Sequence, residues 1–435
     1  MCIQINSIKQ NALICLIFIS PLLLFVLINP QDWFGFLLIY FCLLYIFSQK
    51  VFINKKSVLF IVLTLFFFKL LVSITNAFFV NLYGANSDSL RFHNNAANIV
   101  LLNEKINILQ TGTAGYESFL ALFYRVFGIS QFLGQNLSIL AFLISLSTLL
   151  KLSQIIQGDK YQKFIIIFFG FLPSNLIYTS IIMREPYQIM FFLLSLYSLA
   201  KMIKTDKIRP IHYLKFLVFA FLLGMLHNGL LVFSIILVTI GTVIILPKKL
   251  GILRWLISVG IISSILLIVM GETTVLGIST PATEAVFSGN INDYIERYRD
   301  GGMRQEARAT YNTEFDSSSI GAMIVSGSIV FFYYMFAPFP WQLTSVIDLY
   351  AALFNALMVT LFVTACFFYK KERKNNVNRR IIITLLLFSF ILESLWSLGT
   401  VNWGTAIRHH LLAYSVLLVL GSSVILEKLR KLIIK

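Results

Sequence analysis

Charged residues are scarce in this chain. They make up 12% of its 435 residues, and Asp and Glu together number only 19, whereas charged residues average roughly 25% in soluble proteins. Hydrophobic residues reach 58%, and the mean hydropathy is +0.83. This composition argues against an ordinary soluble enzyme, a disordered or fibrous chain and a nucleic-acid-binding domain.

Cysteines and familiar ligand-binding motifs are also scarce. Of the four cysteines, Cys2 lies at the terminus, and Cys15, Cys42 and Cys366 lie in apolar runs. No CxxC, P-loop, GxGxxG or HExxH motif occurs, and no internal repeat is found. These absences argue against a disulfide-stabilised fold, a thiolate metal site and an ATP-driven pump. We expect no cofactor.

Long apolar runs dominate the sequence instead, and each is long enough to cross a bilayer as a helix. Backbone groups in lipid need partners within their own segment, so the predicted fold is all-α, a polytopic integral membrane protein with one domain over residues 1–435. No small-residue cleavage site follows the first run, so we expect a retained span. We predict about 12 spans, at residues 11–29, 33–49, 57–80, 131–150, 162–182, 186–203, 212–226, 230–246, 254–273, 346–369, 380–398 and 410–426.

Basic residues decide how two ambiguous segments cross the membrane. Residues 212–246 have basic flanks on both sides, so we expect them to cross twice, with a turn near His227. If residues 320–345 crossed, the later basic clusters would lie outside, and Pro338 and Pro340 disfavour a continuous helix there. We therefore predict one re-entrant segment at 320–345 and cytoplasmic termini at both ends.

This topology leaves two long extracytoplasmic segments, 81–131 and 274–319. The first contains an aromatic stretch at 116–127 that is expected to lie in the membrane interface. Nine of the 35 Lys and Arg residues fall outside, and all but Lys105 are Arg. Arg grips phosphate with two parallel hydrogen bonds, which Lys cannot do. The eight outer arginines are Arg91, Arg125, Arg184, Arg297, Arg299, Arg304, Arg308 and Arg408.

Two short motifs on this outer side combine acids with cations. Asp88, Arg91 and His93 could supply a general base and a phosphate contact, although a solvated loop with an N-cap at Asp88 explains them as well. Arg184 and Glu185 lie between two spans with almost no loop. An Arg at this depth needs a partner or a wet cavity, which favours function over a simple turn.

Polar residues also occur in and between the last spans. Arg408 and His409 open the final helix, where an interfacial loop with snorkelling side chains is the structural alternative. His409 and His410 are neighbours on a helix and point about 100° apart, which disfavours a shared zinc ion. Asp348 and Glu393 are intramembrane acids, and such residues are functional candidates by default.

The second outer segment alternates cations with aromatic residues. Tyrosine rings stack on sugars, and arginines bind phosphates or acidic sugars. A solvated amphipathic helix is an equally good interpretation of this pattern. The candidate glycan-binding residues here are Tyr294, Arg297, Arg299, Arg304 and Arg308.

With these motifs the chain resembles the Wzy-type polymerases of O-antigen, capsular polysaccharide and exopolysaccharide, and related GT-C-like membrane glycosyltransferases. The resemblance implies a GT-C-like fold in the bacterial inner membrane and polymerisation of undecaprenyl-diphosphate-linked repeat units, with a flippase and chain-length regulators as partners. The family's outer-loop arginines correspond to Arg297, Arg299, Arg304 and Arg308. The motifs that carry it are Asp88-Ser89-Leu90-Arg91-Phe92-His93, Arg184-Glu185, the Arg297-to-Arg308 loop, Pro338-Phe339-Pro340-Trp341 and Gly404-Thr405-Ala406-Ile407-Arg408-His409.

Taken together, these residues favour a metal-independent glycosyl transfer in which arginines neutralise the departing diphosphate. We expect the catalytic residues to be Asp88, His93 and Glu185, and the diphosphate ligands to be Arg91, Arg184, Arg408 and His409. One alternative is a GT-C transferase that uses a polyprenyl-monophosphate sugar and a divalent ion, and a ligase is a further possibility. A lipid-linked oligosaccharide transporter ranks third, because such proteins show internal repeats.

Overall fold

The computed structural model describes residues 30–82, 88–206, 209–246, 250–253, 256–257, 260, 299, 309–311, 313–316, 318–372 and 375–433. Within these ranges the chain is almost entirely helical and contains no strand beyond an isolated antiparallel bridge between Thr310 and Asn402. The all-α prediction is therefore confirmed for this part of the chain.

The helices of the described ranges follow one another along the chain. They are η1 (Pro30–Asp32), α2 (Trp33–Ser48), α3 (Lys50–Ile53), α4 (Lys56–Phe78), α5 (Asp88–Leu101), α6 (Gly112–Phe127), α7 (Gln131–Gln157), α8 (Gln162–Gly170), α9 (Pro173–Tyr178), α10 (Glu185–Thr205), α11 (Pro210–Met225), α12 (Asn228–Ile245), α16 (Ile320–Phe336), η3 (Pro340–Gln342), α17 (Val346–Lys371), α18 (Asn376–Gly399) and α19 (Trp403–Ile433).

Eight of these helices are long and apolar enough to cross a membrane: α2 with the turn before it, α4, α7, α10, α12, α17, α18 and α19. The chain is thus a multi-pass membrane protein. Helices α11 and α16 are apolar but shorter. The expected pair of helices in 212–246 is confirmed, because α11 ends at Met225 and α12 begins at Asn228. The expected spans 11–29 and 254–273 lie outside the described residues, apart from isolated positions of the second.

The expected single span at 162–182 is wrong, because the chain forms two short helices, α8 and α9, in its place. Helix α8 stops at Gly170, and Pro173 begins α9. Proline lacks an N–H and disfavours helical geometry in the residue before it, so a helix cannot run through this point unbroken. The Asn175 side chain donates to the backbone oxygen of Phe169 at 2.6 Å and satisfies one carbonyl that the break exposes.

Local sequence explains where several helices begin. The Ser130 hydroxyl accepts a hydrogen bond from the Leu133 N–H at the start of α7, and Ser345 plays the same part for Asp348 in α17. These contacts satisfy N–H groups that have no partner in the first turn. Helix α6 ends before Gly128, whose φ of 99° is a conformation that glycine adopts without strain.

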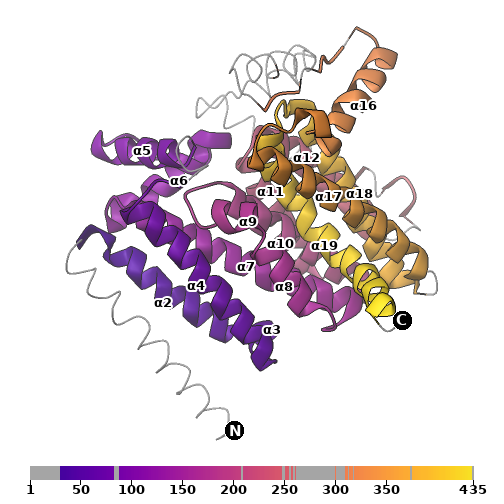
Figure 1. The fold of residues 1–435 in the computed structure, drawn as a ribbon, viewed down its shortest axis with the longest axis horizontal. Helices are drawn as coiled ribbons and strands as arrows, with labels where there is room; N and C mark the ends of the chain where they lie inside the picture. Colours follow the sequence, from indigo (N-terminus) through magenta and orange to yellow (C-terminus); the bar gives the residue numbers. More distant parts are fainter. Residues whose placement is uncertain are drawn as a thin grey trace, which may run out of the picture.

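Helices α7, α10 and α19 form the centre of the bundle. In each of these helices, 72–78% of the most apolar 18-residue stretch is buried inside the protein, compared with 39% for α4. Figure 1 shows α2 and α4 on one side of this centre and α17 and α18 on the other, with α5 and α6 lying across one end. Leu137, Leu193 and Leu412 are among the residues buried in these central helices. A lipid-facing ring thus surrounds a packed core.

Lysine-rich helix ends meet at the other end of the bundle. Lys55 donates to the Asp159 carbonyl at 3.2 Å, and Lys204 donates to the Ile155 carbonyl at 2.8 Å. Lys371 bonds to a carboxylate near the end of α19. These lysines lie just before α4 and near the ends of α10 and α17, so one end of the molecule gathers cations from several segments. The arginine-containing motifs of α5, α10 and α19 lie at the opposite end.

Helix α16 lies within the segment that was predicted to be re-entrant. Before it, Thr310 pairs with Asn402. After it, the Trp403 indole donates to Asp348 at 3.0 Å. Residues before α16 and the start of α17 therefore lie at the end of the bundle where α19 begins, and the re-entrant path of residues 320–345 stays a prediction. The Asn355 side chain of α17 donates to the Ala337 carbonyl at 2.6 Å and holds the turn after α16.

Candidate functional site

Three helices that are far apart in the sequence bring charged side chains together at the arginine end of the bundle. Nη1 of Arg408, in α19, lies 2.7 Å from Oδ2 of Asp88, the first residue of α5. Arg91, one turn further along α5, lies 3.0 Å from the other oxygen of the same carboxylate. Asp88 thus holds two guanidinium groups at once.

The first turn of α10 supplies the next pair of charges. Nη1 of Arg408 lies 3.8 Å from Oε1 of Glu185. Arg184 donates to the Leu226 carbonyl at 3.2 Å, and its guanidinium lies 5.4 Å from the centre of the Phe92 ring. We call Asp88, Arg91, Arg184, Glu185 and Arg408 the arginine cluster. It contains three cations and two anions.

Helical spacing explains why these residues face one another. Asp88 and Arg91 are three residues apart, so they share a face of α5. Phe92 is buried beside them, and the guanidinium groups of Arg91 and Arg184 lie over its ring. Arg184 and Glu185 sit at the start of α10, where the backbone is fixed by Pro186 in its first turn. An acid at a helix N-terminus also suits the helix dipole.

The cluster is open on one side. The side chain of Arg91 is 54% exposed, that of Arg408 is 19% exposed, and that of Glu185 is 8% exposed. The charges therefore extend from a buried interior to a solvent-accessible rim. An anion that enters from the rim meets guanidinium groups from α5 and α19.

A third acid, Glu117 of α6, lies beside the cluster. Its carboxylate accepts a hydrogen bond of 2.9 Å from the Asn95 side chain, which is one turn beyond Arg91 on α5. Burial raises the pKa of Glu117, and the Asn95 hydrogen bond and the charges of Arg91 and Arg184 reduce this rise without cancelling it. Glu117 therefore takes up a proton more readily than an ordinary glutamate.

Asp88 shows the opposite behaviour. Burial alone would raise its pKa, but the charge and hydrogen bond of Arg408 and the charges of Arg91 and Arg184 hold the pKa below the usual value. Asp88 thus remains a carboxylate across the physiological range. Two neighbouring acids with opposite shifts are typical of sites in which one group carries charge and the other exchanges a proton.

Aromatic and imidazole rings border the cluster on the side of α18. The His409 ring stacks on Trp396, with ring centres 3.8 Å apart and an angle of 11° between planes, and His227 lies edge-on to the same indole at 4.7 Å. Nδ1 of His409 lies 2.8 Å from the Thr400 hydroxyl. Burial and the nearby cations Arg184 and Arg408 lower the pKa of His227 to about 3, which keeps it neutral.

His93 and His410 bond to partners outside the arginine cluster. Nδ1 of His93 lies 2.7 Å from the Tyr124 hydroxyl, and burial lowers the pKa of this imidazole. His410 pairs with Glu393 instead of sharing a ligand with His409. The sequence argument that the adjacent histidines diverge is therefore confirmed.

The second outer segment is described only at a few positions. Arg299 is 1% exposed, and it donates to the Leu398 carbonyl at 3.1 Å and to the carbonyl and hydroxyl of Thr313 at 2.7 and 2.9 Å. In this structure Arg299 thus joins its loop to the end of α18 and does not present its guanidinium to solvent. The other candidate glycan-binding residues, Tyr294, Arg297, Arg304 and Arg308, lie outside the described residues.

The intramembrane acids serve local contacts. Asp348 accepts hydrogen bonds from Thr344, Ser345 and Trp403, so it joins the first turns of α17 and α19. Glu393 is bonded to His410 within the core. Among the described residues, no group of three or more His, Cys, Asp and Glu side chains comes together in a way that could hold a metal ion.

Sequence reasoning missed Glu117, Asn95 and Trp396. Glu117 belongs to the stretch that was interpreted as an interfacial aromatic segment, where it is the single acid between residues 105 and 131. That isolation was the available signal, because an acid among aromatic residues needs a polar partner. No signal of this kind marked Trp396, since its role depends on a stack with a residue of another helix.

Searches for similar proteins return nothing for this chain: no family model, no curated protein and no solved structure matches it.

Proposed function

We propose that the protein transfers a glycan from a lipid-linked diphosphate to a hydroxyl group of a second lipid-linked glycan, and so polymerises repeat units of a surface polysaccharide. One observation carries the proposal: the guanidinium groups of Arg91 on α5, Arg184 at the start of α10 and Arg408 on α19 gather around a partly exposed site at one end of the helix bundle. A diphosphate attached to a lipid presents its charge at such a depth, while its tail remains among apolar helices.

The chemistry is a substitution at the anomeric carbon. The acceptor oxygen forms a bond to this carbon as the bond to the diphosphate oxygen breaks, and the electron pair leaves with the diphosphate. Arg91, Arg184 and Arg408 would stabilise the growing negative charge, which is the task that preorganised donors perform best. Without substrate, Asp88 and Glu185 hold Arg408 in position.

The hydroxyl proton needs an acceptor, and we assign this task to Glu117 beside the cluster. Its pKa is raised by burial, while Asp88 is held as an anion by arginines. We therefore assign Asp88 to positioning Arg408 and Glu117 to accepting the proton, with His93 as the alternative base from the sequence. In this mechanism arginines neutralise the leaving group, so no divalent ion is required.

The proposed setting is the bacterial inner membrane, with the arginine end outside and the lysine-rich end in the cytoplasm. This orientation follows the excess of cations at cytoplasmic ends of membrane helices. A GT-C-like arrangement, and a flippase and chain-length regulators as partners, belong to the same proposal. The donor would reach the outer face before transfer.

The test is a reaction with purified protein and diphosphate-linked repeat units in excess EDTA. We expect longer lipid-linked glycans and released lipid diphosphate. Arg408→Lys should lower the rate about 100- to 1,000-fold, as the loss of one transition-state contact does, because one ammonium cannot replace a planar fork. Arg125→Lys is the matched control, because Arg125 contacts only the Glu104 carbonyl among its described hydrogen bonds.

Two results would contradict the proposal. Full loss of turnover in EDTA that is restored by magnesium or manganese would favour a metal-using transferase with a monophosphate donor. Equal rates for Arg408→Lys and Arg125→Lys, at equal protein level, would place the diphosphate elsewhere.

A further inference from the structure

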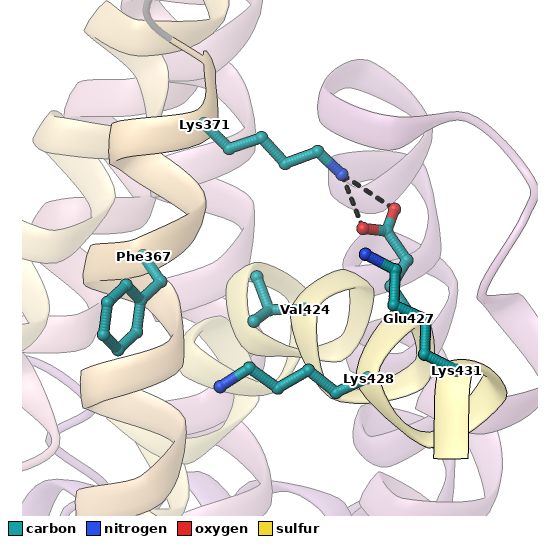
Figure 2. A pocket seen from close by; sticks show the side chains of 6 residues that line it. All are labelled: Phe367, Lys371, Val424, Glu427, Lys428 and Lys431. Carbon is teal, nitrogen blue, oxygen red and sulfur yellow. Dashed lines mark hydrogen bonds and ion pairs between the residues drawn. The ribbon is translucent and has the colours of Figure 1, made fainter. Parts of the chain in front are cut away.

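A basic pocket lies at the lysine-rich end of the bundle, between the last turns of α17 and α19 (Figure 2). Its volume is about 280 Å³. It shares no residue with the arginine cluster. Its lining residues are Phe367, Lys371, Val424, Glu427, Lys428 and Lys431.

The charges within this pocket are unbalanced. Nζ of Lys371 donates to both oxygens of Glu427, at 2.8 and 2.6 Å, so this ammonium and this carboxylate neutralise each other (Figure 2). Lys428 and Lys431 add two further ammonium groups, and no second carboxylate lines the pocket. The pocket therefore carries excess positive charge and is suited to an anion.

The other wall of the pocket is apolar and continues onto the surface that faces lipid. Phe367 is 50% exposed, and Val363, one turn earlier on the same face of α17, is 47% exposed. Nζ of Lys428 lies 5.4 Å from the centre of the Phe367 ring, and Figure 2 shows this side chain extending toward that ring. A ligand in the pocket would meet cations at one end and an apolar helix face at the other.

We propose that this pocket binds the phosphate group of an anionic phospholipid in the leaflet around this end of the bundle, with an acyl chain along Phe367 and Val363. Basic pockets between transmembrane helices bind such headgroups, and lysine stems lie along apolar surface while their ammonium groups reach the interface. The inference does not depend on the proposed glycan transfer, because the two sites lie at opposite ends of the molecule.

The experiment is native mass spectrometry of the full chain in detergent, titrated with phosphatidylglycerol or phosphatidylcholine. We expect the wild type to retain phosphatidylglycerol in preference to phosphatidylcholine. Lys428→Gln/Lys431→Gln should weaken phosphatidylglycerol binding about 10- to 30-fold, from the contribution of two lysines near an anionic headgroup, and should leave phosphatidylcholine binding unchanged.

Lys50→Gln/Lys56→Gln is the matched control, because it removes the same charge from two exposed lysines of α3 and α4. Equal weakening in both double variants would overturn the proposal, since diffuse surface charge would explain it. If a double variant fails to fold, its gel-filtration profile shows this. The single substitution Phe367→Ala then tests the same pocket through its apolar wall.

A second arm separates a lipid from a soluble phosphate. Glycerol phosphate and inorganic phosphate are added to the lipid-bound protein, and Phe367→Ala is compared with the wild type. We expect neither soluble anion to displace phosphatidylglycerol at equal concentration, and we expect Phe367→Ala to weaken lipid binding. Displacement by either soluble anion, or no effect of Phe367→Ala, would contradict a lipid site.

Discussion

At the scale of single residues, the acids near the arginine cluster differ in what surrounds them. Asp88 bonds to two guanidinium groups, whereas Glu117 bonds to the neutral amide of Asn95. A carboxylate that is held by two cations is a poor base, because protonation would break both ion pairs. A half-buried carboxylate beside an amide takes up a proton more readily. This difference predicts distinct consequences for substitutions at the two positions.

Glu117→Gln should remove the acid limb of the pH profile. As a base, Glu117 acts in its carboxylate form, so activity is present above its pKa and is lost as the pH falls through it. Burial raises that pKa above the ordinary value of 4.5, so the limb in kcat/KM should lie above pH 4.5. Loss of a general base should lower the rate about 100- to 10,000-fold.

Asp88→Asn provides the comparison for this prediction. It should also slow the reaction, because Arg408 loses its closest carboxylate, but the acid limb should stay in place. Glu104→Gln, in the outer segment after α5, should change neither rate nor profile. An unchanged acid limb in Glu117→Gln would show that another group accepts the proton, and His93 would be tested next.

At the scale of helices, a buried lysine from α4 contacts the end of the short helix α9. Lys69 is fully buried, and its Nζ donates to the Asn175 carbonyl at 3.2 Å and to the Thr179 hydroxyl. The ammonium also lies 3.7 Å from the centre of the Phe142 ring. Lys69 therefore adds a buried donor at the end of α9, where the Asn175 carbonyl also accepts a hydrogen bond of 3.2 Å from the Thr179 N–H.

Lys69→Met should lower the thermal stability of the protein. Methionine fills similar space but donates no hydrogen bond, and losing a donor to buried acceptors costs roughly 1–3 kcal/mol. The midpoint of thermal unfolding in detergent, followed by intrinsic fluorescence, should fall by several degrees. Lys56→Met on the exposed first turn of the same helix is the control. A midpoint equal to that of the control would show that the lysine is dispensable at the end of α9.

Hydropathy predicts most helices because the requirement for apolar length is local to each segment. The turn at His227 was predicted from basic flanks, and α12 begins there, with His227 accepting a hydrogen bond from the Gly229 N–H. Residues 162–182 were predicted to form a single span although Pro173 lies within them, because the apolar run continues on both sides. Whether a proline bends or breaks a helix depends on partners such as the Asn175 side chain, which bonds to the Phe169 carbonyl, and the local sequence does not specify such contacts.

At the scale of the whole molecule, the candidate site depends on contacts between distant segments. Asp88 and Arg408 are 320 positions apart. The sequence predicted that both would face the same side of the membrane, from the distribution of Lys and Arg. Their ion pair was not predictable, because it depends on how α5 lies over the ends of α10 and α19. Charge bias thus predicts the face, and helix packing determines which residues meet on it.

The orientation of this face is the last prediction, and cysteine labelling tests it. Ser318, Trp341 and Asn375 are exposed, and each is replaced by Cys in a chain without its native cysteines. A re-entrant path places both flanks of α16 at the arginine end, so Ser318→Cys and Trp341→Cys should react with an impermeant maleimide in intact cells. Asn375 precedes α18 at the lysine-rich end, so Asn375→Cys should react only after permeabilisation.

Labelling of Ser318→Cys and Trp341→Cys from opposite sides would show that α16 crosses the membrane. Labelling of Asn375→Cys in intact cells would invert the proposed orientation, and it would place the arginine cluster on the cytoplasmic side, away from a donor that has been flipped outward.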